Sequence, residues 1–171
     1  MTRRPEVASP SRVPKSDRVK ADDNLSTGAR PMSHIDLPLS LGIAFKQLPD
    51  GDKPVAMLNL LRYRAQANYA GHPEQAPCSG RDAYRRYVSL VMPLLGDLHA
   101  KTVFLGQWQA TLIGAPGETW DDLLLVEYPN RDAFQSLMQS PKYHAVMFHR
   151  QAALADSRLI AFRPGSASFQ D

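Results

Sequence analysis

Two segments of this chain are apolar on both faces of a strand, and this feature constrains the fold more than any other. Residues 55–63 and 121–128 hold apolar side chains at odd and even positions alike. Because successive side chains of a strand point to opposite faces of the sheet, both faces need cover. The chain has enough helices for one face, so the sequence predicts that a second copy of the chain covers the other.

The expected elements follow one another as strand, helix, strand, strand, helix pair and strand. They are a strand over 55–63, a helix from 79 to 96, strands over 101–114 and 121–128, helices capped at 130 and 140, and a strand over 157–163. This order is the βαββαβ arrangement of ferredoxin-like domains. We therefore predict an α+β fold with a four-stranded antiparallel sheet and helices on one face.

Local signals set the expected ends of the first helix and second strand. Ser79 and Asp82 have the spacing of a capping box at a helix start. Pro93 is expected to kink this helix near its end, and Gly96 to stop it. Gly106 is expected to form a bulge in the strand that follows.

Two further helix starts are expected after the third strand. Asn130 suits the cap of a short helix, and Ser140 followed by Pro141 suits the cap and first position of another. The second of these helices is expected to present one face made of Tyr143, Val146, Met147, Arg150 and Leu154.

The composition predicts one folded domain over residues 54–163. Residues 1–33 lack apolar periodicity and are expected to be a disordered extension, or a mis-annotated one if translation starts at Met32. Residues 34–53 are expected to form a docking segment, and residues 164–171 a frayed tail.

The positive charge of the chain lies in its first thirty residues. These hold seven Lys or Arg against four Asp or Glu, which accounts for the whole formal net charge of +3. The remaining chain is neutral, so the folded domain has no electrostatic footprint for nucleic acid.

Cysteine usage and the missing motifs narrow the function classes. Cys78 is the only cysteine, so no intrachain disulfide forms, and a reducing compartment, the cytoplasm, is expected. No apolar run approaches the roughly 20 residues of a membrane span. The sequence shows no phosphate-binding loop, zinc-ligand spacing or catalytic triad order, so we expect neither a metal nor another cofactor.

Several motifs together resemble one bacterial family. They are NLLRY at 59–63, SGRDAY at 79–84, WDDLLLVEYPNRDAF at 120–134, SPKY at 140–143 and HR at 149–150. The chain is similar to a domain-of-unknown-function family within the dimeric α/β-barrel superfamily of ferredoxin-like proteins. It departs from the resemblance at residues 97–100, where similar proteins often carry a paired glycine.

The resemblance implies an assembly but no reaction. It implies a homodimer, a dimeric α/β barrel whose two sheets face each other inside the helices. Relatives in the superfamily include cofactor-free monooxygenases, haem-degrading enzymes, lyases and plain binding proteins, so fold alone does not indicate chemistry.

Nine residues of the predicted domain are candidates for a site. His149 and His99 are candidate proton carriers. The candidate ligand-binding residues are Asn59, Arg62, Tyr84, Trp108, Glu127, Tyr143 and Arg150. The aromatic members suit a mostly apolar pocket with hydroxyl and indole handles, and each of the nine also has a structural interpretation.

Arg150 is the sharpest of these candidates because it shares a helical stripe with Tyr143 and Met147. A guanidinium on an inward stripe needs a carboxylate, which Glu127 or an acidic ligand would supply. The structural alternative is a bridge to Glu127 or Asp156 without a ligand. His149 is expected at the pocket edge, or else packed and hydrogen-bonded at the junction of helix and sheet.

Asn59 lies in the middle of an apolar strand, where a buried amide must find partners. It either bonds to neighbouring backbone or points into a cavity. Arg62 and Glu127 lie toward strand ends and are expected either to pair with each other or to hold a ligand carboxylate.

Two hypotheses for the function remain open at this point. In the first, a homodimer binds a small organic ligand, with an acid as one option, and acts as a metal- and nucleotide-independent enzyme of oxygenase or lyase type. In the second, the protein is a non-catalytic binding or structural dimer. A cavity of a few hundred Å³ with several converging polar groups favours the first, and solid packing favours the second.

Overall fold

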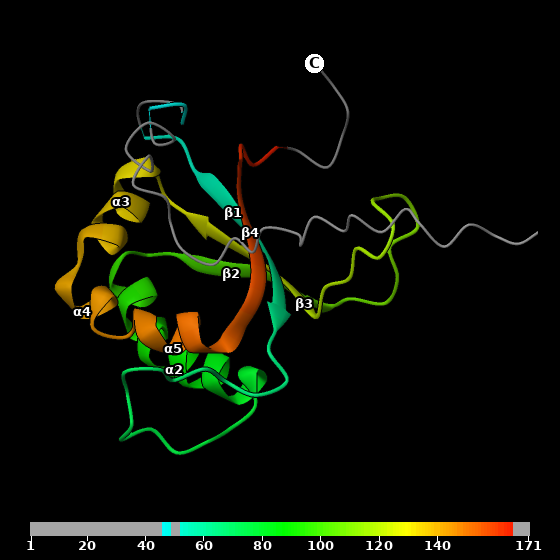
Figure 1. Ribbon diagram of the computed structural model, residues 1–171. Helices are drawn as coiled ribbons and strands as arrows, with labels where there is room; N and C mark the ends of the chain where they lie inside the picture. The colour runs from blue at the N-terminus through cyan, green and yellow to red at the C-terminus, as the bar shows by residue number, and fades with distance from the viewer. Residues whose placement is uncertain (1–45, 49–51, 166–171) are drawn as a thin grey trace, which may run out of the picture. The chain divides into compact units, whose positions relative to one another are not determined.

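A four-stranded antiparallel sheet is the centre of this computed structural model, which describes residues 46–48 and 52–165. Its strands are β1 (Val55–Tyr63), β2 (Lys101–Gln107), β3 (Asp122–Tyr128) and β4 (Leu154–Phe162), in the order β2-β3-β1-β4. The helices are α2 (Gly80–Asp97), α3 (Arg131–Gln139), α4 (Pro141–His144) and α5 (Met147–Ala153). They lie on one side of the sheet (Figure 1). The predicted α+β, ferredoxin-like βαββαβ fold is confirmed.

Several predicted segments lie outside the described residues. They are the extension over 1–33, most of the docking segment over 34–53 and most of the tail over 164–171. Leu48, a described residue of the expected docking segment, packs against the core of the domain.

Two of the three expected helix caps are present. The Ser79 hydroxyl accepts a hydrogen bond from the Asp82 amide at 3.1 Å and starts α2. The Asn130 side-chain oxygen accepts one from the Ala133 amide at 2.8 Å and starts α3. Each cap satisfies an amide that the first helical turn leaves without a partner, so the chain can turn sharply from loop into helix.

The end of α2 differs from expectation. The helix continues through Pro93 and past Gly96 to Asp97. His99 then adopts a left-handed conformation with φ 55°, and its amide donates to the Gly96 carbonyl. The predicted stop at Gly96 is therefore wrong, because the reversal happens at His99, within the segment that departs from the family pattern.

The second strand is shorter than predicted. After Gln107 the Trp108 amide donates to the Asp121 carbonyl, and the chain leaves the sheet. The expected bulge at Gly106 is also wrong, since Gly106 pairs regularly with Leu123. The irregularity lies instead between Thr102 and Phe104, so the extra residue is Val103.

The helix expected from Ser140 to Leu154 is two helices. The break follows α4, and α5 starts only at Met147, after Val146 at φ −111°. Ser140 makes no side-chain capping bond, although Pro141 takes the expected first position. Leu154 already belongs to β4, which starts three residues before the predicted 157.

The strand register sorts the side chains of the sheet into two faces. The inner face looks toward the helices, and three rows of paired residues cross it: Thr102, Val126, Met57 and Ala161; Leu105, Leu124, Asn59 and Leu159; Gln107, Asp122, Leu61 and Ser157. The buried core lies against this face and includes Leu61, Ala83, Phe134, Leu137 and Leu154. The sidedness predicted for the first and third strands is thereby confirmed.

None of the helices in the described part of the chain lies on the outer face. Its central row crosses all four strands as Phe104, Leu125, Leu58 and Ile160. Phe104 and Ile160 are exposed large apolar residues, as is Phe162 in the neighbouring row. An apolar row of this kind across a whole sheet is unusual for a surface that faces only water.

The long loop over 64–79 follows β1 and is tied to the helices by backbone bonds. Arg64 donates to the Ala153 carbonyl and Asn68 to the Ala152 carbonyl, both at 2.9 Å. Gly80 donates to the Arg64 carbonyl at 3.1 Å, so three segments meet at the start of α2.

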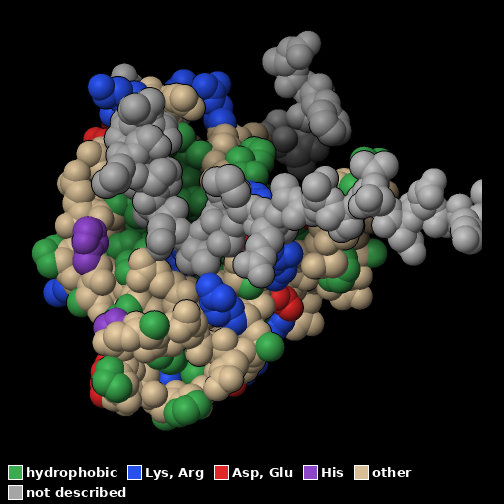
Figure 2. All heavy atoms as spheres, viewed as in Figure 1, with side chains coloured by type: hydrophobic (Ala, Val, Ile, Leu, Met, Phe, Trp, Pro, Cys, Tyr) green, Lys and Arg blue, Asp and Glu red, His purple; other side chains and the backbone are tan. Residues whose placement is uncertain are grey.

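One face of the molecule shows how Lys and Arg are distributed. On the face shown in Figure 2, Lys and Arg are scattered among other side chains without a continuous basic stripe. None of the helices in the described ranges is long and apolar enough to cross a membrane.

Candidate functional site: a cavity between the sheet and the helices

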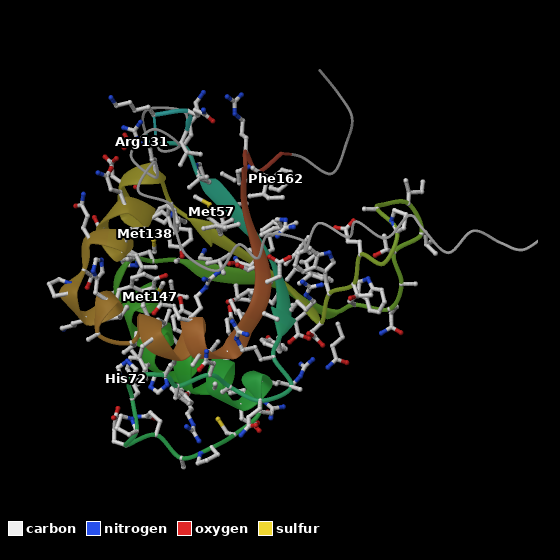
Figure 3. The ribbon with its side chains drawn as sticks, viewed as in Figure 1. Met57, His72, Arg131, Met138, Met147 and Phe162 are labelled. Atoms are coloured by element: carbon white, nitrogen blue, oxygen red, sulfur yellow. The ribbon has the colours of Figure 1, made fainter. Side chains whose placement is uncertain are left out.

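A cavity of about 720 Å³ lies between the inner face of the sheet and the helices. Met57 of β1, Met138 of α3 and Met147 of α5 reach toward it from three different elements (Figure 3). This volume is within the range of small-molecule sites, and most of the lining is apolar. The junction of sheet and helices is therefore hollow.

Four of the nine predicted site residues line this cavity: Asn59, Tyr84, Tyr143 and Arg150. The Asn59 amide nitrogen lies 3.2 Å from the Met57 carbonyl and 3.4 Å from the Leu124 carbonyl. Its amide oxygen makes no hydrogen bond within the described part of the chain. The two interpretations of Asn59 therefore both hold, because one end is structural and the other borders the cavity.

Buried tyrosines supply most of the polar groups on the helix side. The Tyr87 hydroxyl donates to the Tyr143 hydroxyl at 3.2 Å. Among the residues that the structure describes, the Tyr84 and Tyr128 hydroxyls have no hydrogen-bond partner, although these side chains are only 6% and 4% exposed. Neither hydroxyl oxygen is among the fully buried polar atoms without a partner, so both are accessible and can donate to a molecule in the cavity.

These hydroxyls remain protonated at neutral pH. Burial raises the pKa of Tyr84 to about 12, and it raises the pKa values of Tyr87, Tyr128 and Tyr143 as well. A phenol that keeps its proton is a hydrogen-bond donor. The cavity therefore presents neutral donors rather than phenolate charges.

Arg150 brings a positive charge to the same end of the cavity. It is buried on α5, and its guanidinium donates to the Ser157 hydroxyl at 3.1 Å. Its charge opposes the effect of burial on the pKa values of Tyr84, Tyr87 and Tyr143, so it acts on all three phenols. The inward orientation predicted for Arg150 is observed.

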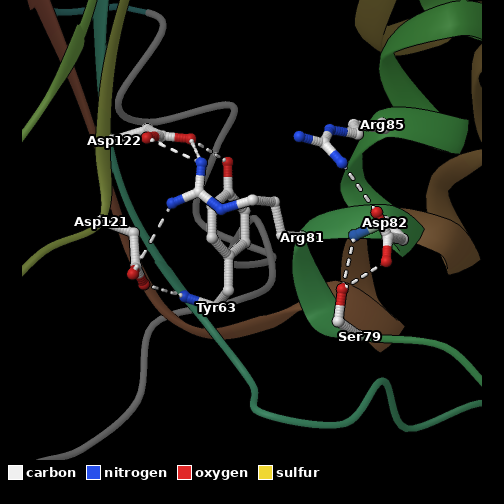
Figure 4. Close-up of polar contacts among 7 residues, drawn as sticks. All are labelled: Tyr63, Ser79, Arg81, Asp82, Arg85, Asp121 and Asp122. Carbon is white, nitrogen blue, oxygen red and sulfur yellow. Dashed lines mark hydrogen bonds and ion pairs between the residues drawn. The ribbon is translucent and has the colours of Figure 1, made fainter.

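The cavity lining holds a second polar cluster, which the sequence analysis did not predict (Figure 4). It consists of Tyr63, Arg81 and Asp122. Arg81 Nη1 donates to both carboxylate oxygens of Asp122, at 3.1 and 2.8 Å. The Tyr63 hydroxyl donates to Asp122 Oδ2 at 2.9 Å, and the Tyr63 amide donates to Asp121 at 2.7 Å. Burial and the bond to Asp122 raise the pKa of Tyr63.

The signal for this group was present in the sequence. Asp122 has the same strand parity as Leu124 and Val126, which were expected on one face. A charged residue beside a turn commonly meets water, and Asp122 is not among the predicted site residues. In the structure Asp122 is 8% exposed, so alternation was the better guide.

Neither predicted proton carrier lines the cavity. His149 is buried against the 64–79 loop, where Nδ1 lies 2.8 Å from the Tyr69 hydroxyl and the ring tilts against Phe148. His99 is exposed in the turn between α2 and β2. The placement of His149 at the pocket edge is therefore wrong, because its helix face points to the loop.

Three ligand-binding candidates also lie away from the cavity. Arg62 is on the outer face and pairs with Asp156 at 3.5 Å rather than with Glu127. Glu127 alternates with Val126 and Tyr128, which line the cavity, so it faces outward and cannot meet Arg150. Trp108 follows β2, and its indole donates to the Thr111 hydroxyl at 3.1 Å.

The described residues contain no group of three His, Cys, Asp or Glu side chains arranged to hold a metal ion. Cys78, which precedes α2, is a half-buried thiol outside the cavity lining. The polar side chains of the cavity lining are Tyr, Arg, Asn, Asp, Ser, Thr and Gln.

His149 is expected to make stability depend on pH. Burial, followed by the charges of Arg86 and His72, lowers its pKa in the folded protein. Neutral His149 can accept the Tyr69 proton at Nδ1 and protonated His149 cannot, so its contribution is present above the unfolded pKa of about 6.5 and is lost as the pH falls below it. Melting temperatures between pH 8 and pH 5 are expected to fall more steeply for the wild type than for His149→Gln. Parallel curves would contradict this.

Comparison with known proteins adds a family and a close structural relative. Among proteins with curated functions, none matches. A family model described as a domain of unknown function (DUF1330) matches residues 76–163. A crystal structure of RPA0582, a protein of unknown function from Rhodopseudomonas palustris, is 36% identical with a TM-score of 0.70, covering 79% of this chain and 99% of that one. The crystal structure of methylated RPA0582 is also 36% identical, with a TM-score of 0.71, covering 79% of this chain and 97% of that one.

More distant structures share less. A dimeric protein of unknown function and ferredoxin-like fold from Bacteroides fragilis is 14% identical, with a TM-score of 0.43, covering 64% of this chain and 95% of that one. The hydroxynitrile lyase of Passiflora edulis is 9% identical, with a TM-score of 0.49, covering 69% and 99%. These values are too low to transfer any activity. The family match and the Rhodopseudomonas relative are sufficient, and the chain belongs to the DUF1330 family.

Proposed function

We propose that the protein is a homodimer that binds a small, mostly apolar organic acid in the cavity between sheet and helices. The observation that carries this proposal is the set of buried donors in an apolar wall. The Tyr84 and Tyr128 hydroxyls lack acceptors within the described residues, and Arg150 adds a positive charge nearby. A ligand oxygen can accept hydrogen bonds from these hydroxyls, and a negative charge on that oxygen strengthens them.

The ligand class follows from the balance of the lining. Most of the wall is aliphatic, aromatic or methionine side chain, which favours an apolar body and adapts to its shape. The donors and the guanidinium favour an oxygen-rich head with negative charge, such as a carboxylate. The volume of about 720 Å³ leaves room for a ligand larger than a single ring.

The same groups suit a metal- and nucleotide-independent enzyme of oxygenase or lyase type. Neutral phenols beside a guanidinium stabilise an oxyanion as it develops. Since His149 and His99 do not line the cavity, a proton carrier in such an enzyme would be a tyrosine, Asp122 or the substrate itself. The alternative is a non-catalytic binding or structural dimer, and absence of turnover with every bound acid would favour it.

The dimer rests on the outer face of the sheet. The row of Phe104, Leu125, Leu58 and Ile160 crosses four strands, and no helix of residues 46–48 and 52–165 covers it. Leu112 and Ile113, in the loop after β2, are almost wholly exposed, and this loop projects away from the side that the helices cover (Figure 1). A two-fold contact would bury both copies of this surface at once.

A pair of matched fluorescent probes tests the acid site. 1-Anilinonaphthalene-8-sulfonate carries an anionic head, and N-phenyl-1-naphthylamine is the same ring system without it. In Arg150→Met the anionic probe is expected to bind on the order of 10- to 100-fold more weakly by calorimetry, the range of one lost charged hydrogen bond. The neutral probe is expected to bind within about twofold of the wild type, since the apolar wall is unchanged.

Two further variants keep this test clear. Arg163→Met removes an exposed arginine beyond β4 and is expected to change neither affinity. Tyr84→Phe removes a buried hydroxyl without a partner, so it is expected to keep or raise the melting temperature while weakening only the anionic probe. Equal weakening of both probes in Arg150→Met and Tyr84→Phe would overturn the acid site.

A further inference from the structure

We infer that Asp122 is a second recognition point of the cavity, which accepts a hydrogen bond from a neutral hydroxyl of the ligand. The ligand would then be a hydroxy acid whose two polar ends are separated by an apolar body. This inference rests on the proposed function, because it concerns the other end of a ligand whose acid group lies at Arg150. The hydrogen-bonding geometry of the Asp122 carboxylate supports the inference.

The Asp122 carboxylate is held firmly but not saturated. An ionised carboxylate offers about four lone-pair sites. Arg81 occupies one on each oxygen, and the Tyr63 hydroxyl occupies a second on Oδ2 (Figure 4). Within the described residues this leaves Oδ1 with capacity for one more donor. Since Asp122 is a buried residue of the cavity lining, that donor comes from the cavity contents.

The carboxylate is also oriented in advance of binding. The Arg81 guanidinium lies 4.9 Å from the centre of the Tyr63 ring, and Arg81 Nη2 is 3.8 Å from Asp121. The Tyr63 amide is fixed to Asp121 at 2.7 Å. Fixing a recognition group in this way reduces the entropy that a ligand loses on binding. The arrangement suits recognition as well as support of the strand end.

Burial favours a neutral donor over a cation at Asp122. Arg81 already neutralises Asp122 at hydrogen-bond distance, and Arg85 is paired with Asp82. An ammonium group would give up its hydration in a mostly apolar cavity for a single hydrogen bond, whereas a hydroxyl gives up less for the same bond. The favoured head group at this end is therefore a phenol or an alcohol.

Asp122 and Arg150 belong to one compartment. Both line the same cavity as Tyr84, and the charges of both act on the pKa of Tyr84. Asp122 also lies in one row of the inner face with Ser157, whose hydroxyl Arg150 binds, and Leu61 lies between the two. A single ligand can reach both.

Pairs of aromatic acids that differ only at the distal position test the inference. We would compare 4-hydroxycinnamate with 4-fluorocinnamate, and the corresponding phenylacetates and benzoates, so that three lengths are sampled. Fluorine is close to hydroxyl in size but donates no hydrogen bond. For at least one length, the wild type is expected to prefer the hydroxy acid by on the order of tenfold in dissociation constant.

The double variant Arg81→Met/Asp122→Leu is compared with the wild type in the same assay. It removes the buried ion pair as a unit, which proteins tolerate better than loss of one partner. In this variant the ratio of the dissociation constants of the fluoro acid and the hydroxy acid is expected to fall to about one, while the fluoro acids keep their affinity. Tyr63→Phe, which frees a lone pair of Asp122 and leaves the carboxylate in place, is expected to keep the preference.

The outcomes separate the two proposals. If neither member of any pair binds, the acid site itself is wrong. If both members bind equally at every length, or if the preference persists in the double variant, the role of Asp122 is overturned while the acid site stands. A preference that disappears only in the double variant supports the inference.

Discussion

Ile160→Asp is expected to give a monomer in solution, whereas Leu90→Asp is expected to leave the mass of the dimer unchanged. The two residues are similar in exposure, at 43% and 45%. They differ in place, because Ile160 ends the apolar row of the outer face and Leu90 lies on α2. A two-fold contact would bury both copies of the new carboxylate in an apolar interface, so we expect the dissociation constant to rise on the order of a hundredfold or more.

Light scattering across a micromolar concentration series measures this difference. Circular dichroism on the same samples distinguishes a folded monomer from an unfolded chain. A dimer that persists in Ile160→Asp, or dissociates equally in Leu90→Asp, would show that the outer face is not the contact. The wild type running as a monomer at these concentrations would reject the dimer altogether.

Gly80→Ala is expected to cost about 3 kcal/mol or more of folding free energy. A β-carbon at Gly80 would meet the carbonyl oxygens of Arg64 and Ala153 and the Arg64 amide nitrogen, all within 2.7 Å. All three are backbone atoms, held by the bonds that join the loop, α2 and α5. None can move aside without breaking that junction.

Gly96→Ala is the matched control. Gly96 also lies in α2, but a β-carbon there would meet nothing within 4 Å. Because alanine favours helix over glycine, this change is expected to stabilise the protein by about 0.5–1 kcal/mol. Urea denaturation of both variants gives the comparison. Gly80→Ala within 1 kcal/mol of wild type would show that the junction relaxes easily.

The parts of the fold that sequence predicted are those governed by local chemistry. β1 begins at Val55 and ends at Tyr63, as expected, because an apolar run follows Pro54 and a polar loop succeeds it. Ser79 and Asn130 start their helices because their side chains satisfy the first free amides. Each of these signals acts within a few residues and needs no tertiary context.

The wrong predictions concern segments whose structure depends on contacts with residues far along the chain. Residues 108–114 have strand-forming side chains, but the chain leaves the sheet where Trp108 binds the Asp121 carbonyl. The stripe from Tyr143 to Leu154 was assigned to one helix, although Leu154 pairs with Tyr63 as a strand residue. In both cases partners far along the chain override the local preference.

The same difference between local patterns and distant contacts applies to the residues of the candidate site. Helical spacing placed Arg150 on the inward stripe correctly, since that depends on α5 alone. His149 went to the wrong place because its partner Tyr69 belongs to a loop whose course no local pattern predicts. Glu127 and Asp122 were misjudged for another reason: strand alternation, already applied to their neighbours, would have placed them on opposite faces.

The bulge at Val103 has a consequence for how copies of the chain can add to one another. β2 is an edge of the sheet, and an edge with regular free amides and carbonyls invites another strand to pair with it. The extra residue between Thr102 and Phe104 interrupts that regular series and increases the local twist. Growth by lateral strand addition, the route to fibres, is thereby disfavoured on this side. A face-to-face contact closes after two subunits, so a single inserted residue favours a finite particle over an open polymer.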